Sequence, residues 1–254
     1  MDTQTINQQV KEIKQSFRQM MDGAVAQSMR EKGLGYHLNW GVTIPRLRQM
    51  ADEIVHSAAF TVQPSEAQPT IHYSLSTIHY YSLSIALWKE NVRECKILAT
   101  MLMPPEEMLP EVADIWMEQT PTLEIAEQAA FNLYQHLPYA ADTAFRWLAS
   151  ADDLPQTCGY HILSRLFMRG QEPNERGINE FLDQAMTALA GAAPRVNPSS
   201  ESGAGPSSGI SDGASYSIAL RKAAMQAVIR FADLSIMHRR LAQSAIRQIG
   251  LSFL

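Results

Sequence analysis

The stretch that decides the fold is WMEQTPTLEIAEQAAFNLYQHLPYAADTAFRWLASADDLPQTCGYHILSRLF, from Trp116 to Phe167. Its apolar residues recur at spacings of three and four, which is the period of an amphipathic α-helix. The residues that carry this pattern are Ile125, Ala129 and Leu133 in one segment, and Tyr160, Leu163, Leu166 and Phe167 in another. Pro121, Pro138 and Pro155 fall at or just inside expected helix starts, where a missing N–H costs nothing. The stretch therefore predicts two helix-turn-helix units in succession.

The same unit recurs along the chain as an aromatic residue near the end of one helix, a short polar turn and an Ala-rich second helix. Its copies are LWKENVRECKILATML (Leu87 to Leu102), WMEQTPTLEIAEQAAFNL (Trp116 to Leu133), RWLASADDLPQTCGYHIL (Arg146 to Leu163) and RFADLSIMHRRLAQSAI (Arg230 to Ile246). A degenerate repeat of about 30 residues is typical of an α-solenoid, in which each helix pair buries its apolar face against its neighbours. We expect an all-α fold of HEAT-like or armadillo type, with Trp88, Trp116, Trp147 and Phe231 as spacers in the core.

Composition agrees with one repeat domain over residues 1–254, because 46% of the residues are hydrophobic. We divide it into N-terminal cap helices (1–40), helical repeats (41–190), a flexible Gly/Ser/Pro-rich loop (191–215) and C-terminal helical repeats (216–254). No run of 18 apolar residues exists, and the N-terminal residues lack a basic-then-apolar signal pattern. Cys95 and Cys158 are expected to be buried, inert thiols. These features predict a cytoplasmic protein.

Two segments are unusual. Residues 6–21 carry apolar side chains at helical spacing, which predicts a first helix that ends near the glycines of REKGLGYHLNWG. The segment TIHYSLS (Thr70 to Ser76) is followed at once by the near copy TIHYYSLS (Thr77 to Ser84), and we expect a helix to begin in the second copy. His72 and His79 are seven residues apart, but no suitable third ligand lies near them, so we predict neither a metal nor another cofactor.

Charge is distributed unevenly along a chain whose net charge is −5. Residues 61–190 carry 7 basic and 17 acidic side chains, whereas residues 191–254 carry 7 basic and 3 acidic ones. Neutralisation of phosphates supplies most of the affinity of proteins for nucleic acid, so the basic C-terminal region is the candidate DNA contact. The candidate DNA-binding residues are Arg48, in a helix that follows Gly41, and Arg221, Lys222, Arg230, Arg239, Arg240 and Arg247. The alternative interpretation is that they are only solubilising charges.

The chain resembles the DNA alkylation repair enzyme family, the AlkD-like HEAT-repeat DNA glycosylases. The segments that carry the resemblance are GVTIPRLRQMADEI (Gly41 to Ile54), LWKENVRECKILA (Leu87 to Ala99) and RWLASADDLPQ (Arg146 to Gln156). The resemblance implies a helical solenoid that binds DNA and excises alkylated, positively charged purines. Such chemistry needs aromatic faces for the cationic base and a carboxylate near the sugar.

This sequence departs from the family at the positions that carry the chemistry. The family's Trp-Asp-x-x-Asp segment matches Leu123 to Glu127, so the Trp is lost and Glu127 replaces the essential Asp. The family's phosphate-binding Arg matches Thr157, and its second Trp falls near Gln226. Glu127 is the one candidate catalytic residue, and the alternative is a helix N-terminal acid in a run that Thr122 begins like a capping box.

Two functional hypotheses remain open from the sequence. In the first, the chain is a DNA-alkylation-repair-family protein that binds DNA, with weak or absent glycosylase activity. In the second, it is a non-catalytic scaffold whose concave face binds a protein partner, in keeping with the acidic centre and a pI of 5.8. The sequence contains no GxSxG, HExxH, P-loop or GxGxxG pattern that would indicate another enzyme class.

Overall fold

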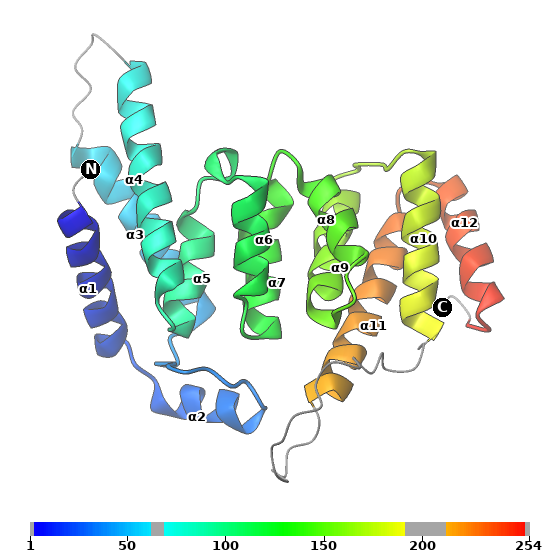
Figure 1. Ribbon diagram of the computed structural model, residues 1–254, viewed down its shortest axis with the longest axis horizontal. Coiled ribbons are helices and arrows are strands. Elements are labelled where there is room, and N and C mark those ends of the chain that lie inside the picture. The colour runs from blue at the N-terminus through cyan, green and yellow to red at the C-terminus, as the bar shows by residue number, and fades with distance from the viewer. Residues whose placement is uncertain (1–2, 62–68, 191–211, 252–254) are drawn as a thin grey trace. The chain divides into compact units, whose positions relative to one another are not determined.

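The computed structural model describes residues 3–61, 69–190 and 212–251 (Figure 1). Within these ranges the regular elements are helices, and one isolated bridge joins Leu38 to Val92. The chain forms two compact units, Met1–Pro138 and Tyr139–Leu254. The predicted all-α fold is confirmed, whereas the prediction of a single repeat domain stays a prediction.

Unit 1 is built from helices, with short connections at residues 90–92 and 119–122. Its elements are α1 (Thr3–Gln19), α2 (Gly23–Glu31), α3 (Ile44–Thr61), α4 (Pro69–Lys89), α5 (Arg93–Leu102), η1 (Pro105–Glu107), α6 (Pro110–Glu118), α7 (Leu123–Asn132) and η2 (Tyr134–His136). Helix α5 packs against α3, α4 and α7, and α1 packs against α4. Helix α5 is therefore the centre of this unit.

Unit 2 continues the same pattern. Its elements are α8 (Ala140–Leu148), α9 (Asp153–Met168), α10 (Glu175–Ala190), α11 (Asp212–Ala232) and α12 (Ile236–Gln248). Helix α9 packs against α8 and α11, and α11 also packs against α10 and α12. The predicted 191–215 loop lies outside the described residues as far as residue 211. Its last four residues are helical, because α11 already begins at Asp212, and an acid is favoured at the start of a helix.

The aromatic residues of the repeat are core spacers, as predicted. Trp88, Trp116, Trp147 and Phe231 are each at most 5% exposed. The rings of Trp88 and Trp116 stack with their centroids 4.1 Å apart. Phe231 meets Phe167 and Phe181 in the core of unit 2. Cys95 and Cys158 are both buried, as expected.

Two predicted helix boundaries are wrong. The first helix ends at Gln19 instead of near residue 33, and a second helix begins at Gly23. Its N-cap is Asp22, whose carboxylate accepts hydrogen bonds from the N–H groups of Ala24 and Val25. Helix α4 begins at Pro69, before the first copy of the tandem segment, rather than in the second. A spacing of seven residues is close to two helical turns, so both copies continue one helix.

Candidate nucleic-acid interface

Glu127, the candidate catalytic residue, lies on α7 with an exposed side chain. The predicted cap at Thr122 is confirmed, because its hydroxyl accepts a hydrogen bond from the N–H of Ile125 at 3.5 Å. Partial desolvation, followed by the negative charge of Glu124, raises the pKa of Glu127 above its ordinary value. The two carboxylates are therefore close enough to interact.

Glu124 is committed to a polar network inside unit 1. Arg93 donates from Nη2 to its Oε1 at 2.6 Å and from Nε to its Oε2 at 2.9 Å. The hydroxyl of Tyr36 also donates to Glu124. Desolvation would raise the pKa of Glu124, but the hydrogen bonds and charge of Arg93 outweigh it and lower that pKa. This carboxylate is a structural anchor between α5, α7 and the segment that contains Tyr36.

A second carboxylate completes that anchor. Glu94 is fully buried, pairs with Arg93 at 3.2 Å, and accepts hydrogen bonds from the N–H groups of Trp40 and Val42. The adjacent Gly41 has φ 76°, and a Cβ there would lie 2.1 Å from the carbonyl oxygen of Asp22. The segment before α3 is thus fixed by buried charge and by a glycine that has no space for a side chain.

An aromatic face close to Glu127 along the chain already holds a protein cation. Phe131 lies one helical turn beyond Glu127, and the guanidinium carbon of Arg48 is 5.4 Å from the centroid of its ring. At this distance a cation and an aromatic ring attract each other. The first family Trp position, Leu123, carries an aliphatic side chain. Arg48 therefore already makes the cation–π contact with Phe131 that a cationic base near Glu127 would need.

The other two family positions belong to unit 2 and also differ chemically from the family. Thr157 is fully buried, and its hydroxyl donates to the carbonyl oxygen of Asp153 at 2.7 Å. It points into its own helix and cannot contact a phosphate. Gln226 is exposed on α11 and has no aromatic face.

A cluster of arginines joins the last turns of α9 and α11 in unit 2. Arg165 and Arg169 are four residues apart at the end of α9, so they lie on one face. Arg230 lies in the last turn of α11, which packs along α9. Desolvation, and then the positive charges of Arg230 and Arg169, lower the pKa of Arg165. We call Arg165, Arg169 and Arg230 the arginine cluster.

Asp233 pairs with one arginine of the cluster and with one arginine of α12. It lies 3.8 Å from Arg230 and 3.5 Å from Arg239. The buried Nε of Arg230 has no hydrogen-bond partner within the described part of the chain. Asp233 thus offsets part of the positive charge of Arg230 and Arg239, and cations are favoured at helix C-termini.

The remaining predicted DNA-binding residues lie on α11, α12 and α3. Arg221 and Lys222 are exposed on α11, and Arg239, Arg240 and Arg247 are exposed on α12, which packs on α11. Arg48 belongs to unit 1. Sequence reasoning missed Arg165 and Arg169, although their i, i+4 spacing in RLFMR was a usable signal. Their proximity to Arg230 depends on the packing of two helices that are distant in sequence.

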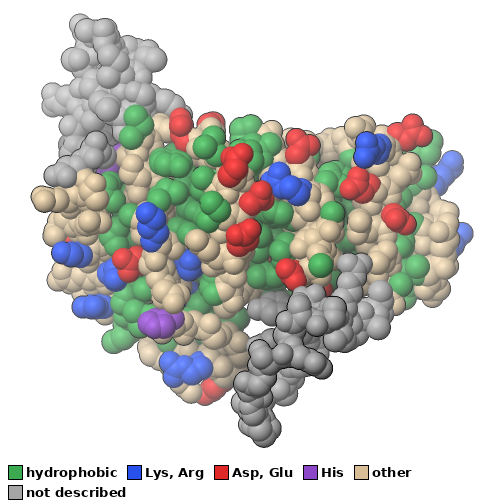
Figure 2. All heavy atoms as spheres, in the orientation of Figure 1, with side chains coloured by type: hydrophobic (Ala, Val, Ile, Leu, Met, Phe, Trp, Pro, Cys, Tyr) green, Lys and Arg blue, Asp and Glu red, His purple; other side chains and the backbone are tan. Residues whose placement is uncertain are grey.

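The surface charges are mixed. On the face drawn in Figure 2, Lys and Arg side chains gather over the first helices of unit 1, and Asp and Glu side chains lie over α6 and its neighbours. Over the described ranges, no group of three His, Cys, Asp or Glu residues is placed to hold a metal ion. None of the helices that the structure describes is long and apolar enough to cross a membrane.

Comparison with known proteins gives one informative likeness. No family model and no curated protein matches the chain. A solved structure from a new family of proteins related to the HEAT-like repeat DNA glycosylases, with affinity for branched DNA structures, superposes with a TM-score of 0.65. The match covers 96% of this chain and 84% of that one, at 14% sequence identity. The chain has a HEAT-like repeat fold.

The shared fold agrees with the resemblance in the sequence and does not by itself carry an activity. At 14% identity most surface residues differ between the two proteins, so the surface chemistry must be read from the residues of this chain. In unit 1 these residues form a structural polar network beside Glu127. In unit 2 they form the arginine cluster.

Proposed function

We propose that this protein binds DNA through the arginine cluster and the neighbouring cations of α11 and α12. The observation that carries the proposal is the arrangement of Arg165, Arg169 and Arg230 at the ends of two helices that pack together, where their like charges repel one another. Guanidinium groups bind phosphate with paired hydrogen bonds, so a DNA backbone would relieve this repulsion. The affinity for branched DNA of the similar solved structure supports the same ligand.

The proposed activity is binding without base excision. The carboxylate of Glu127 is present, but the positions of the two family Trp residues hold Leu123 and Gln226. Arg48 lies over the aromatic ring of Phe131, one helical turn beyond Glu127. A cationic base placed there would meet a positive charge instead of an open π face.

The binding proposal is tested by reversing charge at two positions of the cluster. Arg165→Glu with Arg169→Glu should weaken binding to a fluorescent DNA duplex about tenfold or more, because each lost phosphate contact lowers affinity. The matched control is Arg146→Glu with Arg176→Glu, which changes the net charge equally on α8 and α10. An equal loss of affinity in both variants would show that only the net charge matters, and it would contradict the proposal.

The absence of excision is tested separately. Purified protein incubated with alkylated duplex DNA should release no free base above the level without protein. Release that disappears in Glu127→Gln would contradict the non-catalytic part of the proposal and leave DNA binding intact.

A second candidate function, protein binding, is favoured by a pocket of about 560 Å3 in unit 2. Its lining contains the apolar side chains of Phe145, Leu163 and Phe167 together with Asp142, Glu172 and Glu180. An apolar lining with carboxylates fits a basic, apolar peptide segment. A fluorescent peptide of alternating Leu and Arg should bind the wild type and lose affinity in Asp142→Lys with Glu180→Lys. Equal binding to both would eliminate this candidate.

A further inference from the structure

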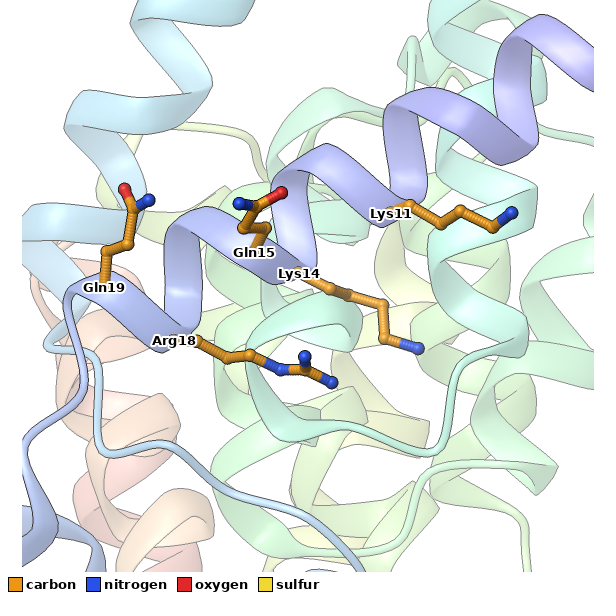
Figure 3. A pocket seen from close by; sticks show the side chains of 5 residues that line it. All are labelled: Lys11, Lys14, Gln15, Arg18 and Gln19. Carbon is orange, nitrogen blue, oxygen red and sulfur yellow. The ribbon is translucent and has the colours of Figure 1, made fainter.

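A second cationic surface lies in unit 1, on the first helix. Lys11, Lys14, Gln15, Arg18 and Gln19 line a hollow of about 610 Å3 beside α1. Figure 3 shows the three cationic side chains extending from the helix in one direction, whereas Gln15 and Gln19 extend in another. We call these five residues the α1 stripe.

The stripe lies on the face of α1 that does not enter the core. The opposite face buries Ile6, Val10, Ile13 and Phe17. From Lys11 to Arg18 the helix rises about 10 Å, which is the axial rise of about three phosphates on one DNA strand. The charges are therefore spaced to follow a nucleic-acid backbone.

Glu12 and Glu90 make contacts of their own at this helix. Glu12 accepts a hydrogen bond from Gln8 at 2.9 Å, and Glu90 pairs with Lys14 at 2.6 Å. Lys11 and Arg18 are exposed, and neither makes an ion pair with any residue that the structure describes. The stripe thus presents two uncompensated cations, a tethered lysine and two amide groups that can donate hydrogen bonds.

We propose that the α1 stripe binds the phosphates of a second DNA arm. This inference rests on the proposed function, in which the arginine cluster of unit 2 holds one duplex. A branched DNA offers more than one arm, and the chain carries one cationic surface in each unit. The stripe then contributes to preference for branched over linear DNA instead of to affinity for a single duplex.

A membrane surface is the other anionic partner that an amphipathic basic helix can bind. Such binding requires the apolar face of the helix to enter the lipid. In α1 this face is buried, with Phe17 fully inaccessible. The observed packing therefore favours DNA over lipid.

The test is the charge-reversal variant Lys11→Glu with Arg18→Glu, measured by fluorescence anisotropy on a four-way DNA junction and on a linear duplex of the same arm sequence. The matched control, Arg30→Glu with Lys32→Glu, changes the net charge equally at exposed positions at the end of α2. The milder variant Lys11→Gln with Arg18→Gln should reproduce the direction of the effect, and circular dichroism checks that each variant is folded.

We expect the stripe variant to weaken junction binding about tenfold or more while duplex affinity changes less than about threefold. Unchanged junction binding, or an equal loss in the control, would overturn the inference and leave the proposed function standing. If the wild type binds neither the junction nor the duplex, both the inference and the proposed function are contradicted. Binding to phosphatidylserine vesicles that the stripe variant loses, with junction binding unaffected, would assign the stripe to lipid and also overturn the inference.

Discussion

Arg93 is the residue on which the interior of unit 1 depends most. Its side chain is 1% exposed and contacts Glu94, Glu124 and the carbonyl oxygen of Val42. Removing one partner of a buried ion pair leaves an uncompensated charge and costs about 3–5 kcal/mol. We therefore expect Arg93→Met to lower the free energy of unfolding by about that amount. Urea titration followed by tryptophan fluorescence measures it, because Trp40, Trp88 and Trp116 lie in unit 1.

The control for Arg93 is the half-exposed pair of Lys14 and Glu90. Partly exposed ion pairs contribute about 1 kcal/mol or less, so Glu90→Gln should change stability little. If Glu90→Gln and Arg93→Met cost the same, the buried network does not have the importance that its geometry indicates.

His161 should make unit 2 sensitive to mild acid. Desolvation, and then the positive charge of Arg165, lower the pKa of His161 from 6.5 to about 4. Between these values the unfolded chain binds a proton that the folded chain does not, so stability falls as the pH falls from 6.5 toward 4. His161→Gln should reduce this loss in thermal melts across that range, whereas His37→Gln, at an exposed position, should not. Parallel curves for His161→Gln and the wild type would contradict the assignment.

The residues of the candidate site were only partly predictable from the sequence. The segment Leu123 to Glu127 and its cap at Thr122 are local features, so the pattern could identify them. The separate roles of Glu124 and Glu127 depend on Arg93 and Tyr36, which are 31 and 88 residues away from Glu124. Local periodicity carries no information about such distant partners.

At the scale of the helices, α8 and α9 approach closely at Gly159. A Cβ at this position would lie 2.8 Å from the carbonyl oxygen of Ala144 and 3.2 Å from the side chain of Leu148. Alanine is the better helix former by about 1 kcal/mol, but the clash should outweigh this gain. We expect Gly159→Ala to destabilise unit 2 by about 1–3 kcal/mol in urea titrations.

Gly23 provides the matched substitution, because no atom lies within 4 Å of a Cβ built there. Gly23→Ala at the start of α2 should leave stability unchanged or slightly higher. A stabilising Gly159→Ala would show that α8 and α9 can separate without cost.

Helix existence was more predictable than helix ends. The aromatic spacers and the period of three and four identified the pairs α6/α7, α8/α9 and α11/α12. The predicted helix ends are wrong where a local signal competes with the apolar pattern. Asp22 is an example, because its carboxylate caps α2 inside the segment that is expected to be one helix. The predicted start of helix α4 falls too late in the sequence, because the pattern treats the two tandem copies as separate segments. Pro69 is a good first residue for a helix, and α4 begins there.

For the whole molecule, charge decides which functional account holds. The chain has a net charge of −5, so a uniform attraction to DNA is not expected. Binding must come from local surfaces, namely the arginine cluster with the α11 and α12 cations in unit 2 and the α1 stripe in unit 1. This locality makes the salt dependence of binding a direct count of phosphate contacts.

The most direct test of DNA binding is the affinity of the wild type for a fluorescent four-way junction over a series of salt concentrations. Contacts from three or more cations predict that log K falls with log salt with a slope of about −3 or steeper. The slope should become shallower by about 2 in Arg165→Glu with Arg169→Glu. Absence of binding at about 20 mM salt, or an affinity that does not change with salt, would contradict the account, because contacts with phosphate must release counterions.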